Sequence, residues 1–257
     1  MGARHVRRFD DAGEVLQLHR DERRTGTREE AVHRGRERRR VRRRDRRGRR
    51  RGHPGVGERA ACLVIGEDLG VVPDEIRDAM GRYGLYHYKV MIFEKDGGRF
   101  RGPEGYPRRA LATVTTHDLP TIAAYWASRD IALRGRLRLY PSEAIRAQVR
   151  AEREADRAAL LTALAEAGVP AEAPAEAPAA PYAPALATAM HRFLARSGAA
   201  LVAVQLEDLV GVVEPANVPG TYREYPNWRR KVPVPIEDLL ERGDVADALR
   251  AIDQARR

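Results

Sequence analysis

The sequence predicts an α/β fold of the (β/α) barrel type, and three observations support this prediction. Four short, almost continuous apolar runs recur along the chain, helical segments separate them, and each run ends in carboxylates or a histidine. Continuous apolar runs are typical of parallel strands that are buried on both faces. Polar residues at the ends of such strands are typical of the catalytic face of a barrel. A complete TIM barrel has eight strands, so four runs predict a partial barrel.

The four predicted strands are defined by apolar and β-branched residues that stop abruptly at polar ones. They are LVIGED (63–68), YKVMIFE (88–94), ATVTTHD (112–118) and ALVAVQLED (200–208).

Helix signals follow the first and third runs. Pro73 and Asp74 favour a helix start, and Gly81 or Gly84 favours its end, so the first two strands frame a helix. A further helical segment is expected over about 119–138.

A long Ala, Arg and Glu helix follows, with Ser142 as its predicted N-cap and Gly168 at its end. Residues 169–184 form a Pro and Ala linker, which we expect to be extended and semi-rigid. A helix over 185–196 then leads into the fourth strand.

The positive charge of the chain is concentrated in residues 1–60. The net charge is +10, and residues 1–60 contain 21 Arg, no Lys and 10 acids, whereas the remaining residues contain 26 basic and 27 acidic ones. We therefore separate an Arg-rich segment, 1–60, from a near-neutral globular part, 61–257.

The Arg-rich segment has no hydrophobic periodicity, and residues 34–51 read RGRERRRVRRRDRRGRRR. Such a stretch cannot bury an apolar face, so we expect it to be disordered. One interpretation is an arm that binds nucleic acid through phosphates. The absence of aromatic residues from 34–51 disfavours nucleic acid as a partner, because stacking platforms are missing. The alternative is coding sequence translated out of frame.

Composition excludes several other classes of protein. The single cysteine, Cys62, excludes an intrachain disulfide framework. No apolar run approaches the roughly 20 residues of a membrane helix, and no signal-peptide core is present, so we expect no membrane partner and a cytoplasmic location.

The motif GEDLG places Glu67 and Asp68 directly after the first strand. An acid there can simply cap a helix or face solvent. It can also be a carboxylic acid that protonates a leaving group and then deprotonates a nucleophile.

The motif TTHDLPT places His117 and Asp118 at the end of the third strand. Asp118 can cap the next helix, and the pair can bind a metal, but no other histidine stands at a convincing ligand spacing. A metal site is therefore not predicted.

The last motif, NVPGTYREYPNWRRK, contains the amide of Asn217 and the indole of Trp228. Trp228 can pack in a core at the domain edge, or it can stack on a sugar among hydrogen-bonding amides and Arg.

Taken in order, GEDLGVVP, ATVTTHDLPT and VQLED with NVPGTYREYPNWRRK resemble the 4-alpha-glucanotransferases of the amylomaltase, or disproportionating enzyme, type, in glycoside hydrolase family 77. The resemblance runs from Leu63 to about Leu249. It implies that the four strands are the last four of the barrel.

The resemblance implies retaining transfer of a 1,4-alpha-glucan segment to the 4-hydroxyl of an acceptor sugar, without a metal or organic cofactor. Glu67 would be the general acid/base, and Asp118 the carboxylate that stays charged and binds the sugar. His117 and Asn217 would contact the substrate, a maltodextrin or another alpha-1,4-glucan, and Trp228 would be a further binding residue.

The nucleophile is the main departure from the family pattern. In the family it is an Asp in an Arg, apolar, Asp, His run upstream of GEDLG, and residues 1–60 contain no such run. We therefore expect a truncated chain that is inactive alone, with open half-barrel edges that favour self-association. The alternatives are an Arg-rich nucleic-acid-binding protein and a glucan binder without catalysis.

Overall fold

The computed structural model describes residues 62–169 and 181–257. The Arg-rich segment, together with most of the predicted Pro and Ala linker, lies outside the described residues.

Helices and short strands alternate along the described chain. In order they are α3 (Asp74–Tyr83), β1 (His87–Val90), η1 (Met91–Phe93), β2 (Lys95–Asp96), β3 (Arg99–Phe100), η2 (Pro103–Gly105), β4 (Ala110–Thr113), α4 (Ile122–Trp126), α5 (Arg129–Arg136), α6 (Glu143–Glu166), α7 (Pro184–Ala195), β5 (Leu201–Val202), α8 (Leu206–Leu209), α9 (Ile236–Leu239) and α10 (Gly243–Arg256).

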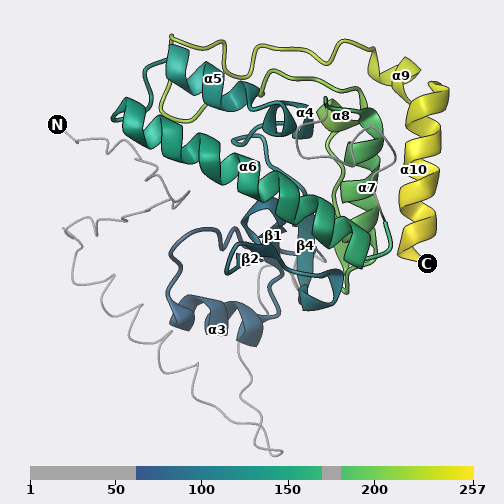
Figure 1. The fold of residues 1–257 in the computed structure, drawn as a ribbon. Helices are drawn as coiled ribbons and strands as arrows, with labels where there is room; N and C mark the ends of the chain where they lie inside the picture. The colour runs from purple at the N-terminus through teal and green to yellow at the C-terminus, as the bar shows by residue number, and fades with distance from the viewer. Residues whose placement is uncertain (1–61, 170–180) are drawn as a thin grey trace, which may run out of the picture.

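The main sheet is parallel, with the order β1-β4-β5. On the outer side of β1, Ile65 forms a parallel bridge with Tyr86. The four predicted runs therefore lie side by side in chain order, as consecutive strands of a barrel do, and the parallel α/β prediction is confirmed. The sheet does not close into a barrel (Figure 1).

The first predicted strand, 63–68, is wrong in extent, because only Ile65 forms a bridge. Gly66 N donates to Tyr86 O, but the next contact to the neighbouring strand is made by a side chain. The carboxylate of Asp68 accepts the backbone N–H of Tyr88 at 2.8 Å. The side chain thus replaces the backbone carbonyl that would have continued the ladder.

The other three strands are also shorter than predicted. The second ends in the 3-10 turn η1, the third spans only Ala110–Thr113, and the fourth gives way to α8. Beyond these points single backbone bonds remain, such as Ala203 N to Ala112 O, and the side chain of Thr115 donates through Oγ1 to Gln205 Oε1 between the third and fourth segments.

Most helix predictions are confirmed. Helix α3 ends at Gly84 with φ 71°, and the Ser142 hydroxyl caps α6 by accepting from Ile145 N at 3.2 Å. The single segment expected over 119–138 is wrong, because Ser128, with φ 52°, divides it into α4 and α5. Its hydroxyl accepts from Arg157 Nη2 at 2.7 Å, which holds this left-handed residue in place.

The larger hydrophobic core cluster packs on one face of the sheet, and a smaller cluster of Val90, Ile92 and Tyr125 buries part of the other. Ala110 and Ala112 of β4 are fully buried against apolar residues of α6 and α7, and their small side chains let the helices approach closely. Figure 1 shows α6 lying across the sheet and α7 beside α10.

The other face of the sheet is incompletely covered. Tyr88, Leu111 and Leu201 occupy equivalent register positions, so their side chains project from the same face. Leu201 is 38% exposed, and so is Ile65 at the opposite edge. The described sheet is therefore open, and the self-association expected for its edges stays a prediction.

The hairpin β2–β3, the short helix α9 and helix α10 were not predicted from the sequence. The hairpin β2–β3 turns at Gly97 and Gly98, both of which have positive φ. Helix α10 packs against α7, and the guanidinium of Arg256 donates to the carbonyls of Ala195 and Ser197 at the end of α7.

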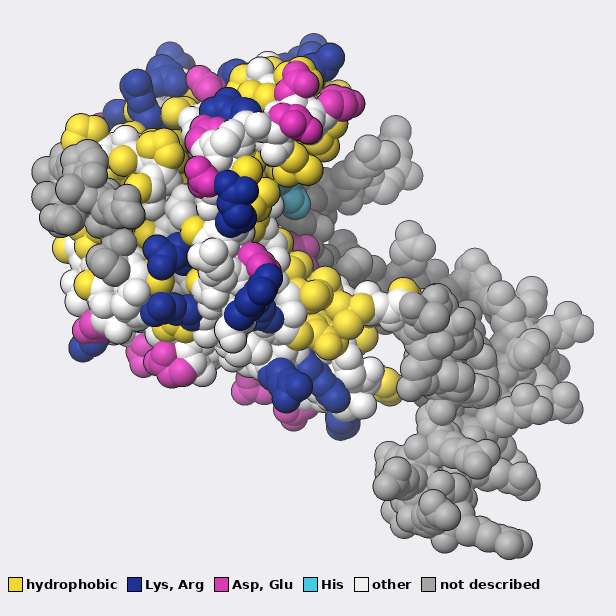
Figure 2. Space-filling model, turned by 90° about the vertical axis from the view of Figure 1, so that its right-hand side faces the viewer, with side chains coloured by type: hydrophobic (Ala, Val, Ile, Leu, Met, Phe, Trp, Pro, Cys, Tyr) yellow, Lys and Arg dark blue, Asp and Glu magenta, His cyan; other side chains and the backbone are white. Residues whose placement is uncertain are grey.

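The surface agrees with the near-neutral charge of the globular part. On the face shown in Figure 2, basic, acidic and hydrophobic side chains are interspersed over the described residues. Within 62–169 and 181–257, no helix has the length and apolar character needed to cross a membrane.

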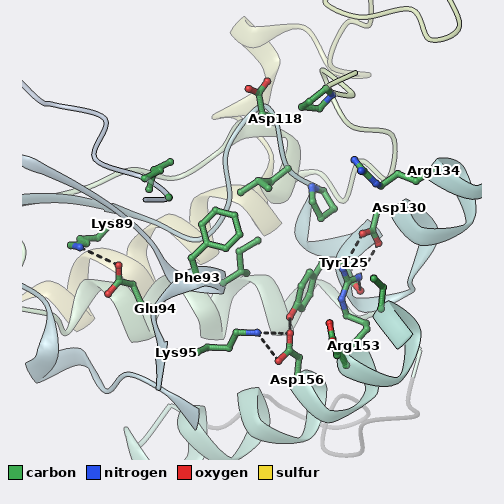
Figure 3. A pocket seen from close by; sticks show the side chains of 18 of the residues that line it. Lys89, Phe93, Glu94, Lys95, Asp118, Tyr125, Asp130, Arg134, Arg153 and Asp156 are labelled. Carbon is green, nitrogen blue, oxygen red and sulfur yellow. Dashed lines mark hydrogen bonds and ion pairs between the residues drawn. The ribbon is translucent and has the colours of Figure 1, made fainter. Parts of the chain in front are cut away.

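A buried ion pair joins α5 to α6. Arg153 is 9% exposed, and its guanidinium donates to both carboxylate oxygens of Asp130 at 2.8 and 2.9 Å and to Tyr125 O at 2.7 Å. Figure 3 shows this pair beside a second one, Lys95 with Asp156. The Arg153 contacts fix α6 to α4 and α5, and the Lys95 pair fixes it to the β2–β3 hairpin.

We expect Asp130→Ala to lower the free energy of unfolding by about 3 kcal/mol, because it leaves the Arg153 guanidinium buried without its counter-ion. Urea denaturation measures the loss. Glu143→Ala is the matched control, since Glu143 also lies in a first helical turn and pairs with an Arg, but on the surface. Its removal should cost at most about 1 kcal/mol, and equal losses would contradict the prediction.

Candidate active site

A cavity of about 210 Å³ lies beside the carboxyl ends of the sheet strands, where Glu67, His117 and Asp118 meet. Glu67 follows the Ile65 bridge, and the other two follow β4. The carboxyl ends of parallel strands open on the same edge of a sheet, so residues about 50 positions apart come together there.

Asn217 joins this group from a loop far along the chain. Its Nδ2 donates to Asp118 Oδ1 at 2.7 Å, and His117 Nε2 lies 3.3 Å from the same oxygen. The Asp118 side chain is 39% exposed, so it keeps an open side toward the cavity. A carboxylate held in this way is oriented but accessible to a ligand.

Asp118 does not cap the following helix. The N-cap of α4 is Thr121, whose Oγ1 accepts from Ala124 N at 3.2 Å. The capping alternative for Asp118 is therefore wrong. In the described part of the chain, no group of three or more His, Cys, Asp and Glu is arranged to hold a metal ion.

Trp228 lies over His117 rather than in the core. The two ring centroids are 5.0 Å apart, and Trp228 is 64% exposed. Trp228 has φ 61°, an uncommon backbone conformation for a residue with a large side chain, and its backbone N–H donates to Ala216 O at 2.9 Å. The loop thus presents an exposed aromatic ring next to the His117–Asp118 pair, and the core-packing alternative is wrong.

The Asn227 side chain holds this loop in shape. Its Oδ1 accepts from Val218 N at 2.9 Å, and its Nδ2 donates to Thr221 Oγ1 at 2.8 Å. These bonds tie the residues before Trp228 to the PGT turn. Asn217 and Trp228 are consequently delivered to the site by one cross-braced loop.

The two acids of GEDLG have different environments. Asp68 is 5% exposed, and its carboxylate accepts from Tyr88 N and bonds His87 Nδ1, both at 2.8 Å. Glu67 is exposed and lines the cavity. Asp68 therefore supports the local fold, while Glu67 is free to face a ligand.

Tyr88 and Phe93 also line the cavity, and neither was predicted as a site residue. Burial, with the charge of Glu67 as a lesser cause, raises the pKa of the Tyr88 phenol, so Tyr88 is close enough to sense the carboxylate and stays neutral. From the sequence, Tyr88 is one residue among others in an apolar strand. Its register with Leu111 places it on the incompletely covered face of the sheet, which we call the inner face.

Asp208, from the end of the fourth predicted strand, does not line the cavity but supports the segment next to it. It is 2% exposed, and its Oδ1 accepts from Ile122 N at 2.8 Å. Its Oδ2 has no hydrogen-bond partner among the described residues. Asp208 therefore anchors the start of α4, just after the segment that carries His117 and Asp118, and burial raises its pKa to about 7.

Comparison with known proteins identifies the family of the chain. The model of the glycoside hydrolase family 77, described as 4-alpha-glucanotransferase, matches residues 25–236. The chain belongs to this family. It is 34% identical over 198 residues to a 4-alpha-glucanotransferase of Haemophilus influenzae, a match that covers 77% of this chain and 28% of that protein.

Two further 4-alpha-glucanotransferase relatives give the same result. A Mycobacterium tuberculosis protein is 37% identical over 209 residues, which cover 75% of this chain and 28% of that protein. The crystal structure of the Corynebacterium glutamicum amylomaltase superposes with a TM-score of 0.65 at 32% identity, over 78% of this chain and 29% of that one. The chain thus spans under a third of the length of these relatives and matches part of an amylomaltase fold.

The extent of the 4-alpha-glucanotransferase match differs from the expected one. It starts at residue 25, upstream of Leu63, and ends at residue 236, before Leu249. Part of the Arg-rich segment is therefore inside the matched region.

The raised pKa of Asp208 predicts a pH-dependent stability. The folded state binds the proton more tightly than the unfolded state, whose reference pKa is 3.8, so this contribution is complete below about pH 4 and is lost as the pH rises through about 7. Asp208→Asn keeps an acceptor for Ile122 N and removes the titration.

When the pH is raised from 5 to 8, the parent chain should lose free energy of unfolding that Asp208→Asn does not lose. Urea denaturation of both proteins at both pH values measures this change in their difference. Asp244→Asn, on the surface at α10, is the control. A stability difference that does not change with pH would contradict the assignment to Asp208.

Proposed function

We propose that this chain provides the acid/base side of a site for retaining transfer of 1,4-alpha-glucan segments, with maltodextrins as substrates. The observation that supports this most is the meeting of Glu67 with Asp118 at one cavity, with Asn217 bonded to Asp118 from 99 positions away. Family membership supports the same reaction type.

In this proposal Glu67 protonates the glycosidic oxygen and later removes the proton of the acceptor hydroxyl. The Glu67 carboxyl group is exposed and lies on the same cavity wall as Ile65, Leu69 and Phe93. This position suits a residue that must exchange protons with a ligand.

The Asp118 carboxylate accepts hydrogen bonds from sugar hydroxyls, and these bonds strengthen as positive charge develops on the ring. The Asn217 amide donates to Asp118 Oδ1 and thereby fixes the orientation of the Asp118 carboxylate. His117 donates to the same sugar, and Trp228 offers an aromatic face beside it.

A retaining reaction needs a nucleophilic carboxylate about 5 Å from the acid/base. Among the described residues, the acids on the cavity wall are Glu67 and Asp118, and Asp118 already has another role. We therefore propose that the four parallel segments are the last four strands of a (β/α)8 barrel and that the nucleophile belongs to the first four. We also propose that residues 61–257 form this part of the barrel as a unit separate from residues 1–60.

We expect the chain to bind maltotriose and Asp118→Ala to weaken this binding by at least roughly tenfold, the loss of a charge-assisted hydrogen bond of about 1.5–3 kcal/mol. Isothermal titration calorimetry measures the affinity. Asp96→Ala, an exposed acid in the β2–β3 hairpin, is the control and should bind like the parent chain. Equal affinities for all three proteins would contradict the role of Asp118.

Turnover is a separate prediction. Incubated with maltotriose, the purified chain should release no glucose and form no longer oligomers, because no further acid of the described residues lines the cavity to act as the nucleophile. Chromatography of the products checks this. If glucose and longer products do form, the nucleophile lies within the chain, and Glu67→Gln should then abolish their formation.

A further inference from the structure

The sheet is open at two edges, and each edge exposes apolar side chains. Within the described residues, Ile65 bridges only to Tyr86 at one edge, and β5 pairs only with β4 at the other. Leu63, two residues before Ile65, is 50% exposed, and Leu201 of β5 is 38% exposed. Edge strands present unpaired backbone N–H and C=O groups, so both edges can accept a further strand.

Helix α3 carries an apolar face that only partly packs on the first edge. Ile76, Met80 and Tyr83 recur at i, i+4 and i+7, so they share one face of the helix. Met80 is 6% exposed, and its side chain packs against Gly66 of the edge segment. Ile76 and Tyr83 are 51% and 76% exposed. Part of this face therefore covers the edge segment, and the rest is open to another element.

The direction of the strands restricts what can occupy the two edges. The strands β1, β4 and β5 are parallel, and a parallel sheet with helices outside it closes as a barrel of eight strands. An occupant that closes the sheet adds parallel strands, whose carboxyl ends lie beside Glu67 and Asp118. It must also bring helices, because the exposed face of α3 needs a helical neighbour. The occupant is therefore a set of further β/α units and not a single peptide strand.

The lengths of the relatives indicate a source for such units. The matched region covers 28% of the Haemophilus influenzae relative and 29% of the Corynebacterium glutamicum amylomaltase. Most of each relative thus lies outside the region shared with this chain.

The charge of the flanking helices disfavours a second copy of the chain as the occupant. Helix α3 contains three acids and two Arg, and α9 and α10 together contain five acids and two Arg. Figure 1 shows α3 and α10 at opposite ends of the described structure. Two copies joined edge to edge would bring these acidic helices together, and juxtaposed like charges are unfavourable.

We propose that the two sheet edges and the exposed face of α3 are a docking surface for a second polypeptide that carries the other β/α units of a family 77 barrel. The partner adds one strand beside Ile65 and another beside β5, and its helices pack on Ile76 and Tyr83. This inference rests on the proposed function, since the same partner supplies the nucleophile that faces Glu67.

Co-expression tests the docking. The full chain is expressed with a tagged fragment of the Corynebacterium glutamicum amylomaltase that contains the residues before its matched region, and light scattering measures the mass of the purified complex. We expect one copy of each chain. Ile76→Lys and Leu201→Lys should each lower the amount of complex roughly tenfold, because each places an ammonium group in an apolar contact. Ala151→Lys, at an exposed position of α6, is the matched control and should assemble like the parent chain.

Three outcomes would overturn the docking. They are an equal amount of complex with Ile76→Lys and with the parent chain, homodimers of the chain in place of the mixed complex, and an insoluble fragment beside a soluble parent chain.

Turnover separates this inference from the proposed function. A mixed complex that does not convert maltotriose would support the docking and contradict the proposed function. In a complex that does convert it, Glu67→Gln should abolish the conversion and leave the amount of complex unchanged.

Discussion

The parallel pairing of the strands is the constraint on which the rest of the molecule depends. Because β1, β4 and β5 run in the same direction, with the Ile65 bridge beside them, their carboxyl ends share one edge. Glu67 and Asp118 meet there although 51 residues separate them in the sequence. An antiparallel arrangement of the same segments would send alternate motifs to opposite edges, and no common cavity would form.

The candidate site is completed by contacts that reach back from the C-terminal third of the chain. Asn217 orients Asp118, and Asp208 anchors the helix that begins just after it. Both contacts join the region around β4 to the residues after β5. The position of the Asp118 carboxylate is therefore set by the tertiary fold on two sides, which is what preorganised binding requires.

The two faces of the sheet have different roles. The outer face is packed, since Ala110 and Ala112 allow α6 and α7 to lie close against it. The apolar side chains of these helices make up much of the larger core cluster. The inner face, with Tyr88, Leu111 and Leu201, is only partly covered and supplies part of the cavity wall. The larger core cluster and the candidate site thus lie on opposite faces of the same strands.

The sequence by itself determined the parallel α/β class, α3, the capped helix α6 and the motifs that carry Glu67, His117, Asp118, Asn217 and Trp228. These follow from local patterns, namely apolar runs, caps, turn residues and polar residues at strand ends. Only the tertiary structure decided that Asp68 is buried and supports the fold, that Thr121 caps α4 and that Trp228 is exposed beside His117. It also decided that two ion pairs, Lys95 with Asp156 and Arg153 with Asp130, line a second cavity. The physical reason is that burial and pairing depend on partners tens of residues away, and no local pattern records which partner a side chain meets.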